Sequence, residues 1–179
     1  MSVTPKKTEN RFKIRDAAAS DMQQISDIYA YYVKNSTATF EESLPDAEEM
    51  SQRWEAISQQ DLPFIVACID SEVAGYAYAF PYRQRKAYRF TLEESVYIKD
   101  GHGGKGLGRG LLQELMRRGT VLKFKQMVAV ITNEAGDDHS GHASIALHKA
   151  CGFKKAGNLE KVGYKFGKWI DTVIMQISL

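Results

Sequence analysis

The amino-acid sequence predicts a single α+β domain. Short runs rich in β-branched and aromatic residues are typical of strands, and longer segments with apolar residues at helical spacing are typical of helices. Their order is a strand, two helices, a series of consecutive strands, a helix, a strand, a helix and two final strands. A doubly wound α/β fold would alternate strand and helix regularly, so this order favours the α+β class.

The first elements follow from apolar spacing and from capping residues. Residues 11–15 alternate weakly and are the candidate first strand. Ser20 or Asp21 is the candidate N-cap of the first helix, and Pro45 with Asp46 opens the second. The two apolar stripes comprise Met22, Ile25, Ile28, Tyr29 and Tyr32 in the first helix, and Ala47, Met50, Trp54 and Ile57 in the second.

The remaining elements alternate between buried strands and two further helices. Residues 64–69 and 73–80 form a predicted hairpin, because the polar stretch 70–72 separates two apolar runs. Further strands are expected at 92–98, 127–132, 153–162 and 169–177. Helices are expected from Leu107 onward and at 143–150, the second ending before Gly152.

Composition places limits on the kind of protein. The chain has 179 residues, 44% of them hydrophobic and 26% charged, which suits one soluble domain over residues 11–179 after a mobile tail at 1–10. The formal net charge of +2 gives no strong case for nucleic acid or a membrane as partner. No signal peptide or membrane span is recognisable, and the two cysteines fit no disulfide framework, so a cytoplasmic protein is expected.

A glycine-rich loop is the most informative motif. The stretch SVYIKDGHGGKGLGRGLL (residues 95–112) places six glycines between a strand and a helix. Free N–H groups at a helix start, approached without interfering side chains, favour a bound phosphate. The alternative is a flexible surface turn.

Two common phosphate-binding loops do not fit. A Walker loop requires Ser or Thr after its lysine, whereas Gly106 follows Lys105. Gly101, Gly103 and Gly106 do match G-x-G-x-x-G, but no acidic residue appears at 122–126 and no βαβ units precede the loop.

The loop instead resembles that of the GNAT acetyltransferase superfamily, Gln/Arg-x-x-Gly-x-Gly/Ala. Residues 103–108 (GGKGLG) match it except at the first position, where Gly103 stands. TLEESVYI (91–98), SIALHKACGF (144–153), GYKFGKWID (163–171) and NSTATFEE (35–42) extend the resemblance to phosphinothricin and methionine sulfoximine N-acetyltransferases over nearly all of the chain after residue 11. The resemblance implies a GNAT fold, with a mixed, mostly antiparallel sheet flanked by helices and splayed between the fourth and fifth strands. It also implies a homodimer.

The resemblance further implies acetyl-coenzyme A as co-substrate. Its pyrophosphate would lie against the main chain of the glycine loop, and its pantetheine arm against the strand 91–98, which carries a bulge in resembling enzymes. The residues expected to contact it are Gly104, Lys105, Gly106, Leu107, Gly108 and Arg109 in the loop, and Val96, Tyr97 and Ile98 in the strand.

The candidate base that accepts the amine proton is Glu93. Strand alternation places Glu93 with Ser95 on one face and Glu94 on the other, unless a bulge intervenes. Glu94 is the second choice, and an exposed strand glutamate without catalytic role is the alternative. His148 matches the histidine that, in the resembling group, donates a proton to the leaving thiolate, although a histidine simply packed on a short helix remains the alternative.

The acceptor site is expected at a basic segment before the same strand. The resemblance assigns substrate contacts to Arg83, Gln84 and Arg85, together with Glu93, Glu94 and Ser95. An arginine fork suits a substrate carboxylate, although a solvated charged loop is the plainer explanation. Phe40 and Tyr88 are candidates for an apolar wall.

The loop over residues 133–142 departs from the resembling enzymes, which carry an asparagine where Gly141 stands. Asn133 is a candidate replacement, unless the contact is lost. Asp137, Asp138, His139 and His142 suggest a metal site, but their spacing fixes no ligand geometry and no metal is expected.

Together these features predict acetyl transfer from acetyl-coenzyme A to the α-amino group of a small amino acid or analogue, such as phosphinothricin, methionine sulfoximine or methionine sulfone. Direct transfer is expected, since neither cysteine has a recognisable nucleophile setting. Acetylation of a protein N-terminus or an aminoglycoside, and a non-catalytic acyl-coenzyme A sensor, remain alternatives.

Overall fold

The computed structural model describes residues 12–134 and 141–179. The expected tail at residues 1–10 and the loop residues Asp137, Asp138 and His139 lie outside the described residues. Within the described part, no helix has the length and apolar character needed to cross a membrane.

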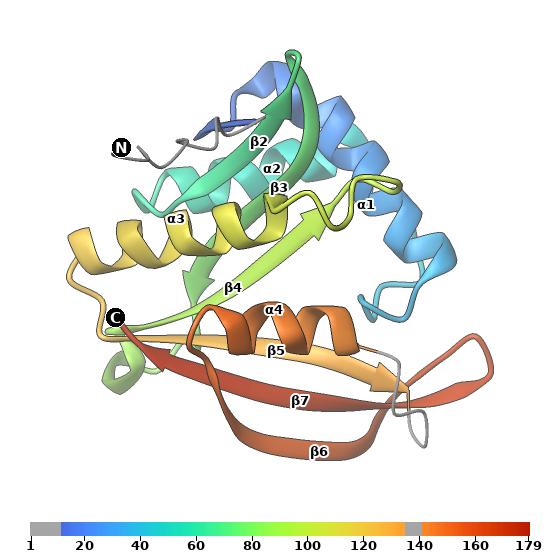
Figure 1. Ribbon diagram of the computed structural model, residues 1–179, viewed down its shortest axis with the longest axis vertical. Coiled ribbons are helices and arrows are strands. Elements are labelled where there is room, and N and C mark those ends of the chain that lie inside the picture. The colour runs from blue at the N-terminus through green and yellow to red at the C-terminus, as the bar shows by residue number, and fades with distance from the viewer. Residues whose placement is uncertain (1–11, 135–140) are drawn as a thin grey trace, which may run out of the picture.

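The described residues form one seven-stranded sheet in the order β1-β2-β3-β4-β5-β7-β6, confirming the predicted mixed α+β fold (Figure 1). All neighbouring strands are antiparallel except the parallel pair β4 and β5. The strands are β1 (Lys13–Asp16), β2 (Phe64–Ile69), β3 (Glu72–Pro81), β4 (Thr91–Ile98), β5 (Gln126–Glu134), β6 (Lys154–Lys165) and β7 (Lys168–Ser178).

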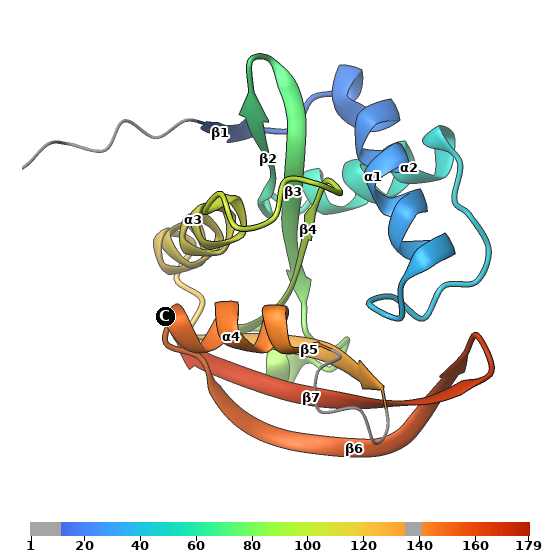
Figure 2. The same ribbon diagram turned by 45° about the vertical axis from the view of Figure 1, so that its right-hand side comes forward.

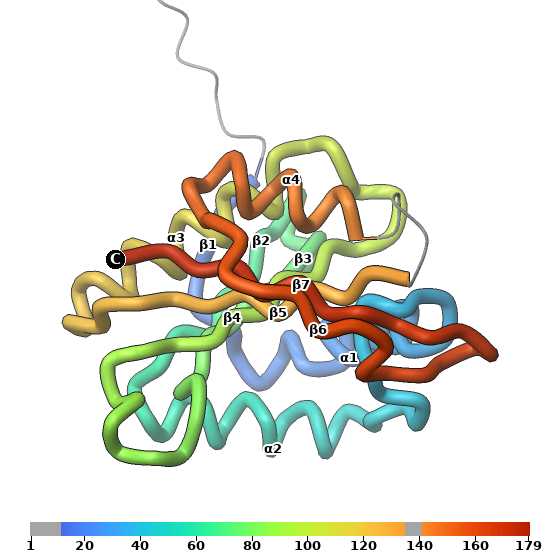
Figure 3. The backbone as a smooth tube through the Cα atoms, turned by 90° about the horizontal axis from the view of Figure 1, so that it is seen from below, coloured from blue at the N-terminus to red at the C-terminus, as the bar shows by residue number. Residues whose placement is uncertain are grey.

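In the part of the chain that the structure describes, four α-helices cover the two faces of the sheet. They are α1 (Met22–Asn35), α2 (Ala47–Ser58), α3 (Leu107–Val121) and α4 (His142–Ala150). The first two helices lie on one face and the last two on the other, with the strands between them (Figures 2 and 3). The apolar stripes predicted from the sequence supply the core, with Ile25, Leu111 and Leu115 fully buried.

The two predicted helix caps behave differently. Asp46 caps α2, because its carboxylate accepts a hydrogen bond from the Glu49 amide at 2.8 Å. Asp21 occupies the N-cap position of α1, as predicted, but its side chain makes no capping bond to that helix. A short 3₁₀ turn precedes α1, and the Asp21 carboxylate binds Arg15 and the Ala18 amide instead. The buried carboxylate thereby joins β1 to the start of α1.

The sheet opens between β4 and β5, as predicted. These strands pair only where residues 91–94 lie opposite residues 126–129, and then diverge (Figure 1). The expected bulge in β4 is absent, because its register with β3 runs without a shift from Leu92 to Ile98. The strands separate because β4 continues along β3 while β5 stays paired with β7 over its full length.

Candidate active site

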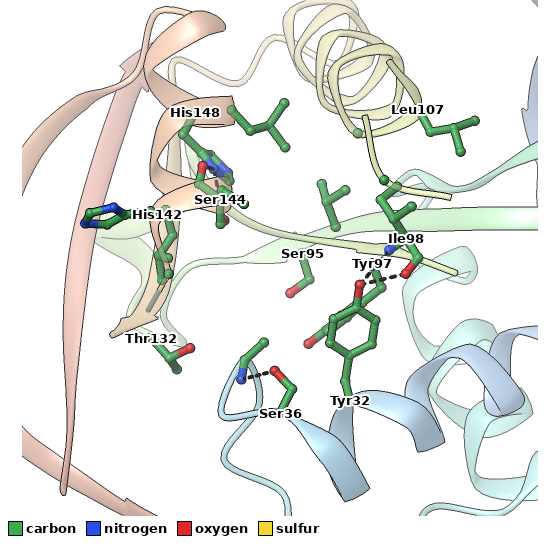
Figure 4. A pocket seen from close by; sticks show the side chains of 18 of the residues that line it. Tyr32, Ser36, Ser95, Tyr97, Ile98, Leu107, Thr132, His142, Ser144 and His148 are labelled. Carbon is green, nitrogen blue, oxygen red and sulfur yellow. Dashed lines mark hydrogen bonds between the residues drawn. The ribbon is translucent and has the colours of Figure 1, made fainter. Parts of the chain in front are cut away.

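A cavity of about 620 Å³ occupies the opening between β4 and β5 (Figure 4). Its walls come from α1 and the following loop, the open end of β4, the glycine loop, β5 and α4. Elements from both faces of the sheet therefore meet around one space, which is wide enough for an extended ligand.

The glycine loop ends in an uncapped helix start at the edge of this cavity. Gly106, with φ of +82°, precedes α3 and no side chain caps that helix. The first helical bond is donated by the Gly110 amide to the Gly106 carbonyl, so the amides of Leu107, Gly108 and Arg109 have no partner within the helix. These amides and the helix dipole favour an anion here.

The space in front of the loop is open. A Cβ atom placed at Gly103, Gly104 or Gly106 would meet no protein atom within 4 Å, and all three residues line the cavity. Gly108 and Arg109 also line it, whereas Lys105 does not. Gly108 has a packing role as well, because a Cβ there would lie 3.1 Å from the Leu147 side chain of α4.

The main chain of β4 offers fewer free groups than the sequence suggested. The Tyr32 hydroxyl donates to the Ile98 carbonyl at 2.6 Å and accepts from the Ile98 amide at 3.2 Å, so both groups are already bonded (Figure 4). In an antiparallel ladder the bonding direction alternates, so the main-chain groups of Tyr97 face β3 and those of Val96 face the opening. Of the three residues expected to contact the pantetheine arm through their main chain, Val96 therefore has groups that face the opening and are not bonded by Tyr32, unlike Tyr97 and Ile98.

Glu94 and His148 form a buried pair in the cavity wall. The His148 Nε2 atom lies 2.7 Å from Glu94 Oε1, with side-chain exposures of 4% and 2%. His148 Nδ1 lies 2.7 Å from the Ser144 carbonyl oxygen. Burial lowers the pKa of His148, but the hydrogen bond and charge of Glu94 outweigh burial, so this pKa is raised overall.

Glu93 lies on the opposite face of β4, with Ser95 and Tyr97. Tyr97 contacts Tyr29 of α1, which identifies this as the face covered by α1 and α2. Burial raises the pKa of the Glu93 carboxyl, Glu94 raises it further, and Arg83 partly opposes the shift. Glu93 is thus a partly buried carboxyl with a raised pKa. It lies where β4 still pairs with β5 and does not line the cavity, whereas its neighbour Glu94 does.

Of the basic segment before β4 (residues 83–85), only part lies near Glu93. Arg83 lies close enough to affect the pKa of Glu93, and its guanidinium carbon lies 5.0 Å from the Tyr82 ring centroid. Arg83, Gln84 and Arg85 are all exposed, and none of them lines the cavity. Tyr88 contacts Tyr82, while Phe40 lies over Gly163 of β6.

Comparison with known proteins identifies this arrangement. Residues 14–174 match the family model described as Acetyltransferase (GNAT) domain. The chain belongs to the GNAT acetyltransferase family.

Individual relatives of this GNAT domain are similar over most of their length. The phosphinothricin N-acetyltransferase of Alcaligenes faecalis is 46% identical, over 93% of this chain and 82% of the relative. The L-methionine sulfoximine/L-methionine sulfone acetyltransferase of Pseudomonas paraeruginosa is 40% identical, over 93% of this chain and 94% of the relative. The structure of a phosphinothricin acetyltransferase from Sinorhizobium meliloti in complex with AcCoA has a TM-score of 0.87 and 42% identity, over 94% of this chain and 89% of that one.

Lys165 of this GNAT domain has a structural role that the spacing of apolar residues in the sequence did not predict. It is 1% exposed, and its ammonium donates to the Ser36 and Thr39 carbonyls at 2.9 Å each. The bonds tie β6 to the loop after α1, part of which lines the cavity. The only sequence signal was its place within GYKFGKWID, since nothing in the strand pattern marks a buried lysine.

Gly141 occupies a position that a larger residue would not fit. Its φ is +72°, and a Cβ there would lie 2.4 Å from the Thr132 carbonyl oxygen. The neighbouring Asn133 Oδ1 is buried without a hydrogen-bond partner among the described residues, but Asn133 does not line the cavity. The structure therefore gives no support for Asn133 as a replacement contact.

Proposed function

We propose that this protein transfers the acetyl group of acetyl-coenzyme A to the α-amino group of a small amino acid. The observation that carries the proposal is the split between β4 and β5, where one cavity is lined by both an uncapped helix start and the buried pair of Glu94 and His148. The similarity to phosphinothricin and methionine sulfoximine or sulfone acetyltransferases favours these amino-acid analogues as acceptors.

Acetyl-coenzyme A supplies an activated thioester to this site. The open space before Gly104 and Gly106 supports binding of its diphosphate to the loop and to the first amides of α3. The Val96 main chain is the proposed contact for the pantetheine arm, since it faces the opening. The GNAT relative from Sinorhizobium meliloti was solved with AcCoA, which agrees with this co-substrate.

In this proposal the two proton transfers take place on opposite sides of β4. Glu93 receives the proton of the acceptor amine, directly or through water, because its pKa is raised and it lies on the face opposite His148. His148 supplies a proton to the leaving thiolate from the α4 side. Direct transfer in a ternary complex follows, because the amine and the thioester approach from different sides of one split strand.

A thiol-release assay with acetyl-coenzyme A tests the function. We expect turnover with phosphinothricin, methionine sulfoximine or methionine sulfone, and little with N-terminal peptides or aminoglycosides. Turnover confined to peptides or to aminoglycosides would show that the acceptor is not a small amino acid. Tight binding of acetyl-coenzyme A without any turnover would favour an acyl-coenzyme A sensor.

Arg83 and Arg85 form a matched pair for testing the acceptor site. The charge of Arg83 reaches Glu93, and Arg83 is the proposed partner of the substrate carboxylate. We therefore expect Arg83→Ala to raise the KM for the amino acid about tenfold while leaving the KM for acetyl-coenzyme A nearly unchanged. Both arginines are exposed, but of the two only Arg83 acts on Glu93, so Arg85→Ala removes the same charge and should change both constants less than about twofold. Steady-state kinetics that show the larger acceptor effect for Arg85 would reassign the carboxylate contact.

We also propose that the protein is a homodimer. Strand β6 ends the sheet and has no neighbour on its outer side among the described residues, and Tyr164, Phe166 and Trp169 around its hairpin are each more than half exposed. Such an edge with exposed aromatic side chains favours association. Light scattering should give about twice the chain mass of 20.1 kDa, whereas a mass of one chain at micromolar concentration would contradict the dimer.

A further inference from the structure

The buried pair of Glu94 and His148 has a feature that the proposed roles do not use. Glu94 Oε1 faces the imidazole, but Glu94 Oε2 is buried and has no hydrogen-bond partner among the described residues. Both residues line the cavity beside the opening in the sheet. An unpaired buried carboxylate oxygen is costly, so its retention at a ligand cavity indicates a function there.

The hydrogen bonds define where the proton of this pair resides. The Ser144 carbonyl can only accept, so His148 Nδ1 carries a hydrogen. Nε2 and Glu94 Oε1 are therefore joined by one further proton, present either as imidazolium and carboxylate or as neutral imidazole and carboxylic acid. Either form holds a single transferable proton in a site with almost no solvent contact.

The surroundings leave Glu94 as the main charge acting on His148. Phe153 packs against the imidazole with ring centroids 5.0 Å apart. Directly after α4 lies the thiol of Cys151, whose pKa is raised by burial and by Glu94 and lowered by the Arg109 guanidinium of α3. On β4, the charge of Glu94 raises the pKa of Glu93, which lies on the other strand face. Removing the Glu94 charge should therefore alter His148 more than any other single change.

We propose that Glu94 is a positioning residue that shares one proton with His148 and keeps it available for the sulfur of coenzyme A. The inference rests on the proposed acetyl transfer. As the amine nitrogen bonds to the acetyl carbon, the carbon–sulfur bond breaks and its electron pair stays on sulfur. The shared proton passes to that sulfur, which leaves the Glu94 carboxylate and neutral His148. The amine loses its surplus proton through Glu93, and the pair regains a proton from solvent.

Glu94→Gln tests this inference, because glutamine keeps the size and a hydrogen bond but removes the charge. Proton donation requires the protonated pair, so activity falls as pH rises through its pKa. Without the carboxylate, the His148 pKa drops and this basic limb moves to lower pH. We expect kcat at pH 8 to fall about 100-fold, with a KM for acetyl-coenzyme A within about threefold of wild type. Glu94→Asp retains the charge and should recover part of the lost activity.

NMR titration provides a readout that does not depend on turnover. The chain has four histidines, so the His148 imidazole signals can be assigned with a His148→Gln reference. His148 should titrate above its ordinary value of 6.5 in the wild type and at lower pH in Glu94→Gln, whereas Glu93→Gln should move this titration far less. Identical titrations in wild type and Glu94→Gln, or identical pH–rate profiles, would overturn the inference. An inactive wild type with a shifted titration would instead reject only the proposed acetyl transfer.

Discussion

Replacing Glu93 by glutamine should lower kcat/KM for the amino-acid acceptor by about 100-fold or more, the range expected for loss of a general base. A glutamine fits the same space and can still hydrogen-bond, but it cannot accept the proton of the attacking amine. Because burial raises the pKa of Glu93, the acidic limb of the wild-type pH profile should lie above the ordinary value of 4.5. The variant should lose this limb, which steady-state assays across pH would show.

The thermal stability of the same variant separates chemistry from folding. A carboxyl whose pKa is raised in the folded state is disfavoured there as an anion, so ionised Glu93 costs stability at pH 7. Glu93→Gln should therefore melt at the same temperature as wild type or higher. Glu55→Gln, at an exposed position of α2, is the matched control and should keep full activity. Wild-type turnover and an unchanged acidic limb in Glu93→Gln would remove Glu93 from the reaction.

The secondary structure was largely predictable because it depends on local spacing. The apolar stripe from Met22 onward, the Asp46 cap and the hairpin around residues 70–72 are all encoded within a few residues. The bounds differ mostly at strand ends: β6 and β7 extend to Lys165 and Ser178, where polar residues continue the ladder beyond the apolar run. Such extensions are decided by pairing, which local spacing does not specify.

The site was less predictable because its contacts join distant parts of the chain. Alternation correctly separated Glu93 from Glu94, but it could not show that Glu94 meets His148, 54 residues away. The same limit applies to Lys165, whose partners lie 126 and 129 residues before it. The alternation of side chains along a strand predicts which face of the sheet a side chain occupies. It does not predict which residue that side chain contacts on that face.

The structure changes two expectations that the resemblance implied for strand β4: its bulge and the free main-chain groups of Ile98. The opening between β4 and β5 exists without a bulge, because each strand simply follows a different neighbour. The Ile98 main chain is bonded by Tyr32, a residue 66 positions earlier that belonged to the predicted apolar stripe of α1. Its hydroxyl reaches the end of β4 only because α1 crosses that face of the sheet.

The second large effect is expected at Gly106, where alanine should weaken acetyl-coenzyme A binding tenfold or more. Gly106 has a φ of +82° and lines the cavity, and a Cβ there would meet no protein atom within 4 Å. Because Gly106 lines the cavity, the added methyl group would stand where the proposed diphosphate approaches the main chain. Isothermal titration calorimetry with acetyl-coenzyme A measures the loss directly.

Gly101→Ala is the matched control for the backbone strain itself. Gly101 has a φ of +73° and equally open surroundings, but it does not line the cavity. Both variants adopt a left-handed conformation that costs an alanine about 1 kcal/mol, so both should lower the melting temperature by a few degrees. Only Gly106→Ala should lose affinity, and its KM for the amino acid at saturating acetyl-coenzyme A should stay near that of wild type. Equal affinities in the two variants would mean that the diphosphate does not approach the main chain at this helix start, and the proposed orientation of acetyl-coenzyme A along the split in the sheet would have to be abandoned.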